Sequence, residues 1–275
     1  MALVHTHFFS ATLGMQRTID VVLPQSASGI GVGGREQGSS IPVLYLLHGW
    51  SDDHTIWQRR TSIERYALEK GLAVIMPGSD LGFYTDMKYG YDFWEFFSNE
   101  LPQIVAEFFP RISTRREDTF VAGLSMGGFG ALKLGINCPE RFAVVASLSG
   151  MVDPLWQYRS GKANEDWLNI FGEENELKGS NSDIHFKLEE LIASGRSMPR
   201  FFQTCGTEDF LYEINVAFRD RFKDRIDLTY HEEPGVHEWG YWDRNIRRII
   251  NWLPIAANSN AVKNAAAEST VEGEK

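Results

Sequence analysis

Short apolar runs recur along the chain and predict strands that lie buried in a sheet. They cover residues 42–47, 72–76, 119–122, 143–148, 200–205 and 226–230. Most of these runs lack polar alternation, which is typical of parallel strands that have helices on both faces. An alternating segment at residues 6–23, which ends before Pro24, predicts one or two edge strands in addition.

Segments between these runs place apolar residues three and four positions apart and therefore predict helices. They cover residues 61–70, 97–108, 126–137, 213–223 and 241–253. We expect Ser98 to cap the second of them, so that Pro102 falls in the first turn, where no backbone N–H is needed. The repeated order of strand, helix and strand predicts an α/β fold with a mostly parallel central sheet and helices on both faces.

The alternation of strand and helix lapses between residues 149 and 197, where a polar stretch rich in aromatic residues takes its place. This stretch is too long for an ordinary connection, so we expect a small cap insertion, at about residues 150–198, that walls a pocket. The length of the chain predicts one domain, which we expect to cover residues 1–255. The Gly- and Ser-rich segment 25–40 predicts a mobile surface loop, and the Ala-, Asn- and Glu-rich segment 256–275 predicts a disordered tail.

Composition narrows the class of protein. Hydrophobic residues make up 43% of the 275 residues and aromatic residues 13%, which is enough for a large core and an aromatic pocket. The formal net charge of −10 argues against nucleic acid or an anionic membrane as a partner, because both need a basic surface. No segment approaches the length of a membrane helix, and the N-terminus lacks the regions of a signal peptide. We therefore expect a cytoplasmic protein, monomeric or homo-oligomeric, whose two cysteines are buried thiols.

The segment Gly123-Leu124-Ser125-Met126-Gly127 lies between a predicted strand and a predicted helix. A serine flanked by glycines in this way can occupy a sharp turn that exposes its hydroxyl, the nucleophile elbow. Glycine removes Cβ atoms that would clash in such a turn, and the N-terminus of the following helix favours negative charge near Ser125. The pattern G-x-S-x-G alone is common by chance, but the strand before it and the helix after it favour a catalytic serine.

A catalytic serine needs a base to take its proton, and the base needs a carboxylate to hold its tautomer. In the α/β-hydrolase arrangement the carboxylate and the base both follow the serine in the sequence, each in a loop after a later strand. Asp209 occupies such a loop and is preferred over its neighbour Glu208, with Asp153 as an outside competitor. His237, in a loop that begins with glycine, is preferred over His231, which we expect to be structural.

The loop after the first buried strand begins His48-Gly49-Trp50, the position from which such folds supply an oxyanion donor. We expect the backbone amides of Trp50 and Met126 to bind the oxyanion, with Gly49 as an alternative to Trp50. The His48 side chain is expected to brace this loop. The histidines show no metal-ligand spacing such as H-E-x-x-H, so no metal site is predicted.

Longer motifs spread over residues 6–254 are YLLHGW, GFYTD, YGYDFWEFF, FFPRIS, FVAGLSMGGFGALKL, GTEDFLYE and GVHEWGYW. Together they resemble the esterase D or putative esterase family, and most closely its tributyrin-esterase branch. The resemblance implies an α/β-hydrolase fold and the hydrolysis of short acyl esters. Carried over by position, the nucleophile of the family falls on Ser125, its acid on Asp209 and its base on His237.

These observations predict a serine carboxylesterase that hydrolyses small acyl esters, from acetyl to butyryl, through an acyl-enzyme and without a metal or cofactor. The acyl pocket is expected to be small and apolar, because the cap and residues 78–94 supply bulky aromatic side chains: Phe83, Trp94, Trp156 and Trp167. Alternatives are an S-formylglutathione hydrolase, a feruloyl or acetylxylan esterase, and an acyltransferase with the same triad. A non-catalytic binding module is disfavoured, because binding modules built on this fold usually lack the serine, the acid or the base, whereas this chain has all three.

Overall fold

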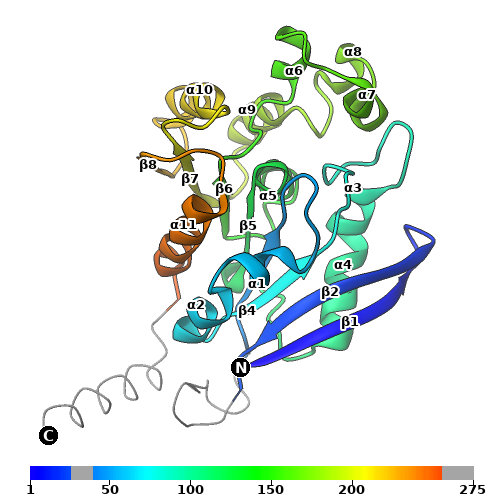
Figure 1. Ribbon diagram of the computed structural model, residues 1–275, viewed down its shortest axis with the longest axis vertical. Helices are drawn as coiled ribbons and strands as arrows, with labels where there is room; N and C mark the ends of the chain where they lie inside the picture. Colours follow the sequence, from blue (N-terminus) through cyan, green and yellow to red (C-terminus); the bar gives the residue numbers. More distant parts are fainter. Residues whose placement is uncertain (26–39, 256–275) are drawn as a thin grey trace, which may run out of the picture.

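Eight strands form one sheet in the part of the chain that the computed structural model describes, residues 1–25 and 40–255 (Figure 1). The strand order is β1-β2-β4-β3-β5-β6-β7-β8. The strands are β1 (Ala2–Ser10), β2 (Met15–Leu23), β3 (Val43–Leu47), β4 (Ala73–Pro77), β5 (Thr119–Leu124), β6 (Val144–Leu148), β7 (Arg200–Gly206) and β8 (Leu228–Glu233). The predicted mobile loop lies outside the described residues except at its two ends, and the predicted tail lies outside them entirely.

The sheet is parallel from β4 to β8, whereas β1 and β2 form an antiparallel hairpin that joins it through β4. The predicted α/β-hydrolase fold is confirmed, and the alternating N-terminal segment forms two strands. Every residue of β3, β4, β5 and β6 is buried. Burial on both faces explains why these runs show no polar alternation.

Helices cover both faces of this sheet. They are α1 (Ile56–Arg60), α2 (Ile63–Lys70), α3 (Phe93–Glu95), α4 (Leu101–Phe108), α5 (Met126–Asn137), α6 (Leu155–Arg159), α7 (Glu165–Phe171), α8 (Glu174–Leu177), α9 (Ile184–Ser194), α10 (Tyr212–Phe222) and α11 (Trp239–Trp252). Because successive strand side chains point to opposite faces, Leu44 and Leu46 share a core with α1, α2 and α11, whereas Val43 and Leu47 share one with α4, α5, α9 and α10. No helix within the described ranges is long and apolar enough to cross a membrane.

The cap is smaller than the sequence predicts. Helices α6, α7 and α8 form it, and they lie together above the sheet in Figure 1. Helix α9 instead packs against α5 and leads into β7, so it is the helix that connects β6 with β7. Its buried residues Ile184, Leu188 and Leu191 follow helical spacing, which the polar composition of the segment obscured.

The helix predicted from residue 97 begins earlier, at Phe93, so the predicted cap at Ser98 is wrong. A π-helical turn, Phe96–Glu100, joins α3 to α4. Pro102 has no N–H to donate to the carbonyl of Ser98, and the guanidinium of Arg141 donates to that carbonyl instead. The wider turn accommodates the proline within a helix that does not end there.

The carboxyl ends of the parallel strands meet at one edge of the sheet, beneath the cap. Ser125 follows β5 there, Asp209 lies in the loop after β7, and His237 lies in the loop after β8. This is the edge at which parallel α/β proteins place ligands. The topology therefore gathers residues that are far apart in the sequence.

Candidate active site

Ser125 occupies a sharp turn between β5 and α5. Its backbone has φ 52° and ψ −114°, a positive φ that residues other than glycine rarely adopt. A Cβ atom on Gly123 would lie 2.3 Å from the carbonyl oxygen of Gly127, and one on Gly127 would lie 2.4 Å from that of Leu47. Both positions therefore require glycine, which lets α5 start close to the sheet.

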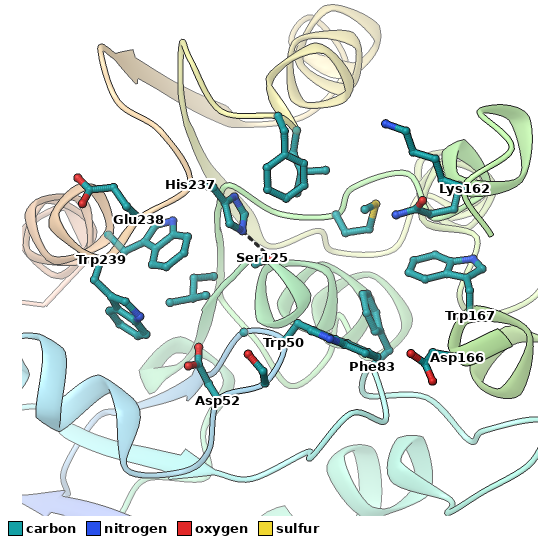
Figure 2. A pocket seen from close by; sticks show the side chains of 18 of the residues that line it. Trp50, Asp52, Phe83, Ser125, Lys162, Asp166, Trp167, His237, Glu238 and Trp239 are labelled. Atoms are coloured by element: carbon teal, nitrogen blue, oxygen red, sulfur yellow. Dashed lines mark hydrogen bonds between the residues drawn. The ribbon is translucent and has the colours of Figure 1, made fainter. Parts of the chain in front are cut away.

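The structure brings Ser125, His237 and Asp209 together. His237 Nε2 lies 2.9 Å from the Ser125 hydroxyl oxygen (Figure 2), and His237 Nδ1 lies 2.8 Å from Asp209 Oδ2. The Asp209 side chain is fully buried, and its other oxygen accepts the Leu211 N–H at 2.8 Å. Because a carboxylate only accepts, Nδ1 carries the proton and Nε2 is left to accept from the serine.

Glu208, the neighbour of Asp209, has a different role. Its Oε2 accepts the Gly235 N–H at 2.5 Å, and its own N–H donates to the Gly235 carbonyl at 3.1 Å. Gly235 lies just before His237 in the same loop. Glu208 therefore fastens the loop that carries the histidine.

Asp153 and His231, the other competitors, lie elsewhere. Asp153 forms an ion pair with Arg159 of the cap. His231 lies within β8, where its Nε2 is 3.3 Å from a carboxylate oxygen of Glu233. Neither side chain hydrogen-bonds to the serine in the described part of the chain.

Aromatic rings fix the orientation of the His237 imidazole. The ring centre of Phe210 lies 4.5 Å from it, and that of Trp242 lies 4.9 Å away in an edge-on arrangement. The indole N–H of Trp242 donates to the Ser149 hydroxyl at 3.2 Å, which fixes the indole in turn. The imidazole is thus held between the acid and the serine by packing as well as by hydrogen bonds.

His48 braces the loop after β3. Its Nδ1–H donates to the Gly49 carbonyl at 2.8 Å, and its Nε2 accepts the Ser79 N–H at 2.8 Å. Burial lowers the pKa of His48 to about 4, so the imidazole is neutral at neutral pH, as an Nε2 acceptor must be. The Tyr84 hydroxyl donates to the His48 carbonyl at 2.9 Å and ties this loop to the segment after β4.

Trp50 lines the pocket that holds the serine, and Met126 directly follows Ser125 in the chain. The backbone N–H of neither residue donates a hydrogen bond to another group in residues 1–25 and 40–255. Met126 begins α5, where the first N–H groups lack helical partners and favour negative charge. The Gly49 N–H, the alternative donor, faces the Asp52 carboxylate; burial raises the pKa of Asp52 by more than this hydrogen bond lowers it.

A pocket of about 820 Å³ surrounds Ser125 and His237. In Figure 2, the pocket residues lie on two sides of the serine, and each side carries aromatic rings and acidic side chains. The first side is lined by Trp50, Phe83 and Trp167 and farther out by Lys162 and Asp166, and the second by Asp52, Glu238 and Trp239. The pocket therefore has an apolar wall next to the serine and a polar rim.

The structure corrects the predicted pocket lining in part. Phe83 and Trp167 line the pocket, with ring centres 5.0 Å apart. Trp94 and Trp156 do not line it, and a lysine ammonium lies over each of these rings, 4.7 Å and 4.5 Å from the ring centres. Composition shows which segments are aromatic but not where each ring points. The backbone of Phe83, for example, has a positive φ of 49°, which no sequence pattern indicated.

The sequence reasoning missed the polar lining. Asp52 lies two residues after Trp50, and Glu238 directly follows His237, so their closeness in sequence to predicted site residues was a usable signal. The polar residues of the cap carry no such signal, because no sequence pattern indicates the path of that segment. Within the described ranges, no three His, Cys, Asp or Glu side chains gather in a way that could hold a metal ion.

A serine at a strand–helix elbow, followed along the chain by an acid and a histidine after later parallel strands, defines the α/β-hydrolase class. A family model described as putative esterase matches residues 10–253. The chain belongs to this family of hydrolases.

Individual relatives agree with this assignment. An acetyl esterase of Caldicellulosiruptor saccharolyticus is 30% identical over 262 residues, which cover 92% of this chain and 98% of that protein. Two solved structures from Staphylococcus aureus are similar: the fluorophosphonate-binding serine hydrolase FphF (33% identity, TM-score 0.82) and the S-formylglutathione hydrolase FrmB (32% identity, TM-score 0.80). Each comparison covers 92% of this chain and 98% of the other. These relatives support an ester-hydrolysing enzyme, whereas the tributyrin-esterase branch stays a prediction.

Proposed function

We propose that this protein is a serine carboxylesterase in which Ser125 is the nucleophile, His237 the general base and Asp209 the acid that orients the base. The observation that carries the proposal is the continuous series of hydrogen bonds from Asp209 through His237 to Ser125, with lengths of 2.8 and 2.9 Å. A general base at this distance can take the hydroxyl proton directly. The proposed reaction uses no metal or cofactor.

In the proposed reaction, Ser125 attacks the ester carbonyl while His237 takes the hydroxyl proton. The N–H groups of Trp50 and Met126 bind the oxyanion, and preorganised donors of this kind typically lower the barrier by about 3–4 kcal/mol each. His237 then gives its proton to the departing alcohol. In the second half, water attacks the acyl-enzyme with the same base, while Asp209 stabilises the imidazolium throughout.

We propose short acyl chains, from acetyl to butyryl, as the preferred substrates. Phe83 and Trp167 support this preference, because only 5% and 7% of their surfaces are exposed and their rings pack together beside the serine. A longer chain that points toward this aromatic wall must displace it or remain in water. The similarity to an acetyl esterase gives further support. A tributyrin-type specificity and a cytoplasmic location stay predictions.

Hydrolysis of S-formylglutathione is the second candidate. Its support is the 32% identity to FrmB and the polar rim of the pocket, where Lys162 and Asp166 offer charges of both signs. Glutathione itself carries carboxylates and an ammonium group. Feruloyl or acetylxylan ester hydrolysis and acyl transfer would use the same three residues and differ only in the acyl group or its acceptor.

The test is a panel of p-nitrophenyl esters from acetate to palmitate, together with methyl ferulate and S-formylglutathione. We expect kcat/KM to be highest from acetate to butyrate and low from octanoate onward. Ser125→Ala should remain folded and lose about five to six orders of magnitude in turnover. A steady rise of kcat/KM toward palmitate would contradict the chain-length proposal, and an active Ser125→Ala variant, free of contaminating esterase, would contradict the mechanism.

A further inference from the structure

Lys133 is a completely buried lysine in α5, and the proposed reaction does not use it. Its ammonium donates to the Thr85 hydroxyl oxygen at 2.6 Å, the one hydrogen bond of that nitrogen within the described residues. Burial lowers the pKa of Lys133 to about 7, and the Asp86 carboxylate acts in the opposite direction. This lysine therefore changes charge near neutral pH, whereas an exposed lysine does not.

Aromatic rings stabilise the charged form of Lys133. Its Nζ lies 4.7 Å from the ring centre of Trp94 and 5.9 Å from that of Phe129, within the range of cation–π attraction. That attraction exists only for the ammonium. The charged side chain is therefore held in this place more firmly than the neutral one.

Asp86 is the charged group that acts on Lys133. Asp92 lies just before helix α3 and Glu95 lies at its end, and both are exposed to solvent. At the start of α9, Asp183 caps that helix and accepts backbone N–H groups. Helix α5 itself carries no other titratable side chain.

A hydrogen-bond chain starts at Lys133 and joins three segments. Thr85 Oγ1 lies 3.1 Å from Ser182 Oγ, and Ser182 Oγ donates to Asn181 Oδ1 at 3.2 Å. Thr85 belongs to residues 78–91, which we call the aromatic loop, and Ser182 lies just before α9. Lys133 thus fastens the aromatic loop between α5 and α9.

The aromatic loop forms a wall of the active-site pocket. It carries Phe83, whose ring centre lies 5.0 Å from that of Trp167 and 5.5 Å from that of Phe129. The backbone N–H groups of Lys88 and Tyr89 donate to carbonyls of α7 at 2.9 Å each. Because α7 carries Trp167, these two hydrogen bonds connect the aromatic loop to the part of the cap that lines the pocket.

The aromatic loop has a backbone that depends on outside contacts. Asp80, Phe83 and Tyr84 all have positive φ, at 47°, 49° and 52°. Such conformations persist only where the surroundings fix them. A weaker contact between Lys133 and Thr85 should therefore let the loop relax.

We propose that Lys133 is a positioning residue whose charge controls how closely the aromatic loop walls the pocket. When Lys133 is charged, Phe83 and Trp167 are held in place and the pocket favours short acyl chains. When it is neutral, the cation–π attraction and the charge-assisted hydrogen bond are lost, and longer chains gain access. This inference rests on the proposed esterase function.

The test compares p-nitrophenyl acetate with p-nitrophenyl hexanoate between about pH 6 and about pH 8. A group with a pKa of about 7 passes from about 90% to about 10% protonated over this range. The ratio of the two kcat/KM values cancels any pH dependence that the two esters share, because both react with the same serine and base and release the same leaving group. We expect the acetate-to-hexanoate ratio to fall by about threefold or more in the wild type and to be constant in Lys133→Met.

Two variants of Thr85 keep the test decisive if Lys133→Met does not fold. Thr85→Val removes the hydrogen-bond acceptor, whereas Thr85→Ser retains a hydroxyl and is the matched control. We expect Thr85→Val to show a low ratio at every pH and Thr85→Ser to follow the wild type. A constant wild-type ratio, a Lys133→Met ratio that falls as in the wild type, or equal behaviour of the two Thr85 variants would overturn the inference.

A second measurement needs no ester and separates this inference from the proposed function. Because Trp94 lies 4.7 Å from Nζ, its fluorescence should change as Lys133 loses its proton. The difference between wild type and Lys133→Met should show a step near pH 7. If neither ester is hydrolysed but the step is present, the esterase proposal fails while the charge change of Lys133 stands. Absence of the step overturns the inference.

Discussion

At the scale of single residues, two adjacent acids act on one histidine loop in different ways. Asp209 is buried and accepts the His237 Nδ1–H, whereas Glu208 accepts the Gly235 N–H and fastens the loop. In the proposed reaction the first role needs a negative charge, because the acid would stabilise the imidazolium that forms. The second needs only an acceptor oxygen. Replacing each acid by its amide separates the two roles.

Asp209→Asn should remain folded and lower kcat/KM on a short ester by about four orders of magnitude, because an amide neither holds the required tautomer of His237 nor stabilises its charged form. Glu208→Gln keeps a carbonyl oxygen for the Gly235 N–H and should cost less than about tenfold. The measurement is kcat/KM of both variants on one ester, with circular dichroism to confirm folding.

Asp153→Asn is the control for this comparison. Asp153 also follows a strand of the sheet, but it pairs with Arg159 and not with the histidine. We expect the Asp153→Asn variant to be nearly as active as the wild type. If Asp153→Asn were the inactive variant and Asp209→Asn nearly normal, the acid would lie after β6 and the assignment of Asp209 would be wrong.

His48 should make the stability of the fold depend on pH. Its neutral form is required, because Nε2 accepts the Ser79 N–H, and burial lowers its pKa from 6.5 to about 4. Between these values the unfolded chain binds more protons than the folded one. The contribution of His48 is therefore complete above pH 6.5 and is lost as the pH falls toward 4, a change of about 3 kcal/mol in the free energy of unfolding.

His48→Gln isolates this effect, because its side-chain carbonyl can accept the Ser79 N–H but does not titrate. Urea unfolding of both proteins at about pH 7 and about pH 4 gives the difference in free energy of unfolding. We expect the wild type to lose about 3 kcal/mol relative to the variant. Equal losses in the two proteins would show that another group causes the pH dependence.

Residue types and their positions after strands were sufficient to propose Ser125, Asp209 and His237 from the sequence, because loops at strand ends converge in a parallel sheet. The same reasoning was wrong for Trp94 and Trp156 as pocket residues. Whether a ring enters the pocket depends on the backbone angles of its loop and on what packs behind it. Neither is encoded in a local pattern of residues.

At the scale of elements, the buried strands were the most predictable feature, because burial on both faces leaves a short apolar run in the sequence. Helix α9 was missed, since its buried Leu188 and Leu191 lie in a segment that is polar overall. The π-helical turn was missed because the guanidinium that satisfies the Ser98 carbonyl belongs to Arg141, far away in the sequence. Local patterns predict elements but not the contacts that reshape them.

The start of α5 is an element boundary that tolerates no side chain at Gly127. A Cβ atom there would lie 2.4 Å from the carbonyl oxygen of Leu47 and 2.6 Å from that of His48. Alanine gains up to about 1 kcal/mol of helix propensity, but a clash with backbone costs about 1–3 kcal/mol or more. We expect Gly127→Ala to lower the melting temperature and, by displacing the loop after β3 that carries Trp50, to lower kcat/KM by about 100-fold.

Gly240→Ala in the first turn of α11 is the matched control. The atoms nearest to a Cβ atom there belong to the flexible carboxylate of Glu238, the closest at 2.9 Å. We expect stability equal to the wild type or slightly higher, with activity retained. If Gly127→Ala were as stable and active as the wild type, α5 would not pack against the carbonyls of Leu47 and His48 as closely as the structure shows.

At the scale of the whole molecule, charge distinguishes between candidate substrates. The chain has a formal net charge of −10. The pocket contains three carboxylates and two cations, which are Asp52, Asp166, Glu238, Arg60 and Lys162. The global charge was evident from the sequence, but this local balance was not, because separate segments supply the five side chains. A neutral ester experiences little of this field, whereas an anionic thioester is repelled as it approaches.

S-formylglutathione is anionic at neutral pH, so its kcat/KM should rise by about threefold when ionic strength increases from about 0.01 M to about 0.15 M. The Debye length shortens from about 30 Å to about 8 Å over this range, which screens the repulsion between substrate and protein. The value for p-nitrophenyl acetate should stay constant and serves as the control for direct effects of salt. A kcat/KM for the thioester that falls with salt would mean that Arg60 or Lys162 attracts its carboxylates, and the S-formylglutathione candidate would then be favoured over a short-chain carboxylesterase.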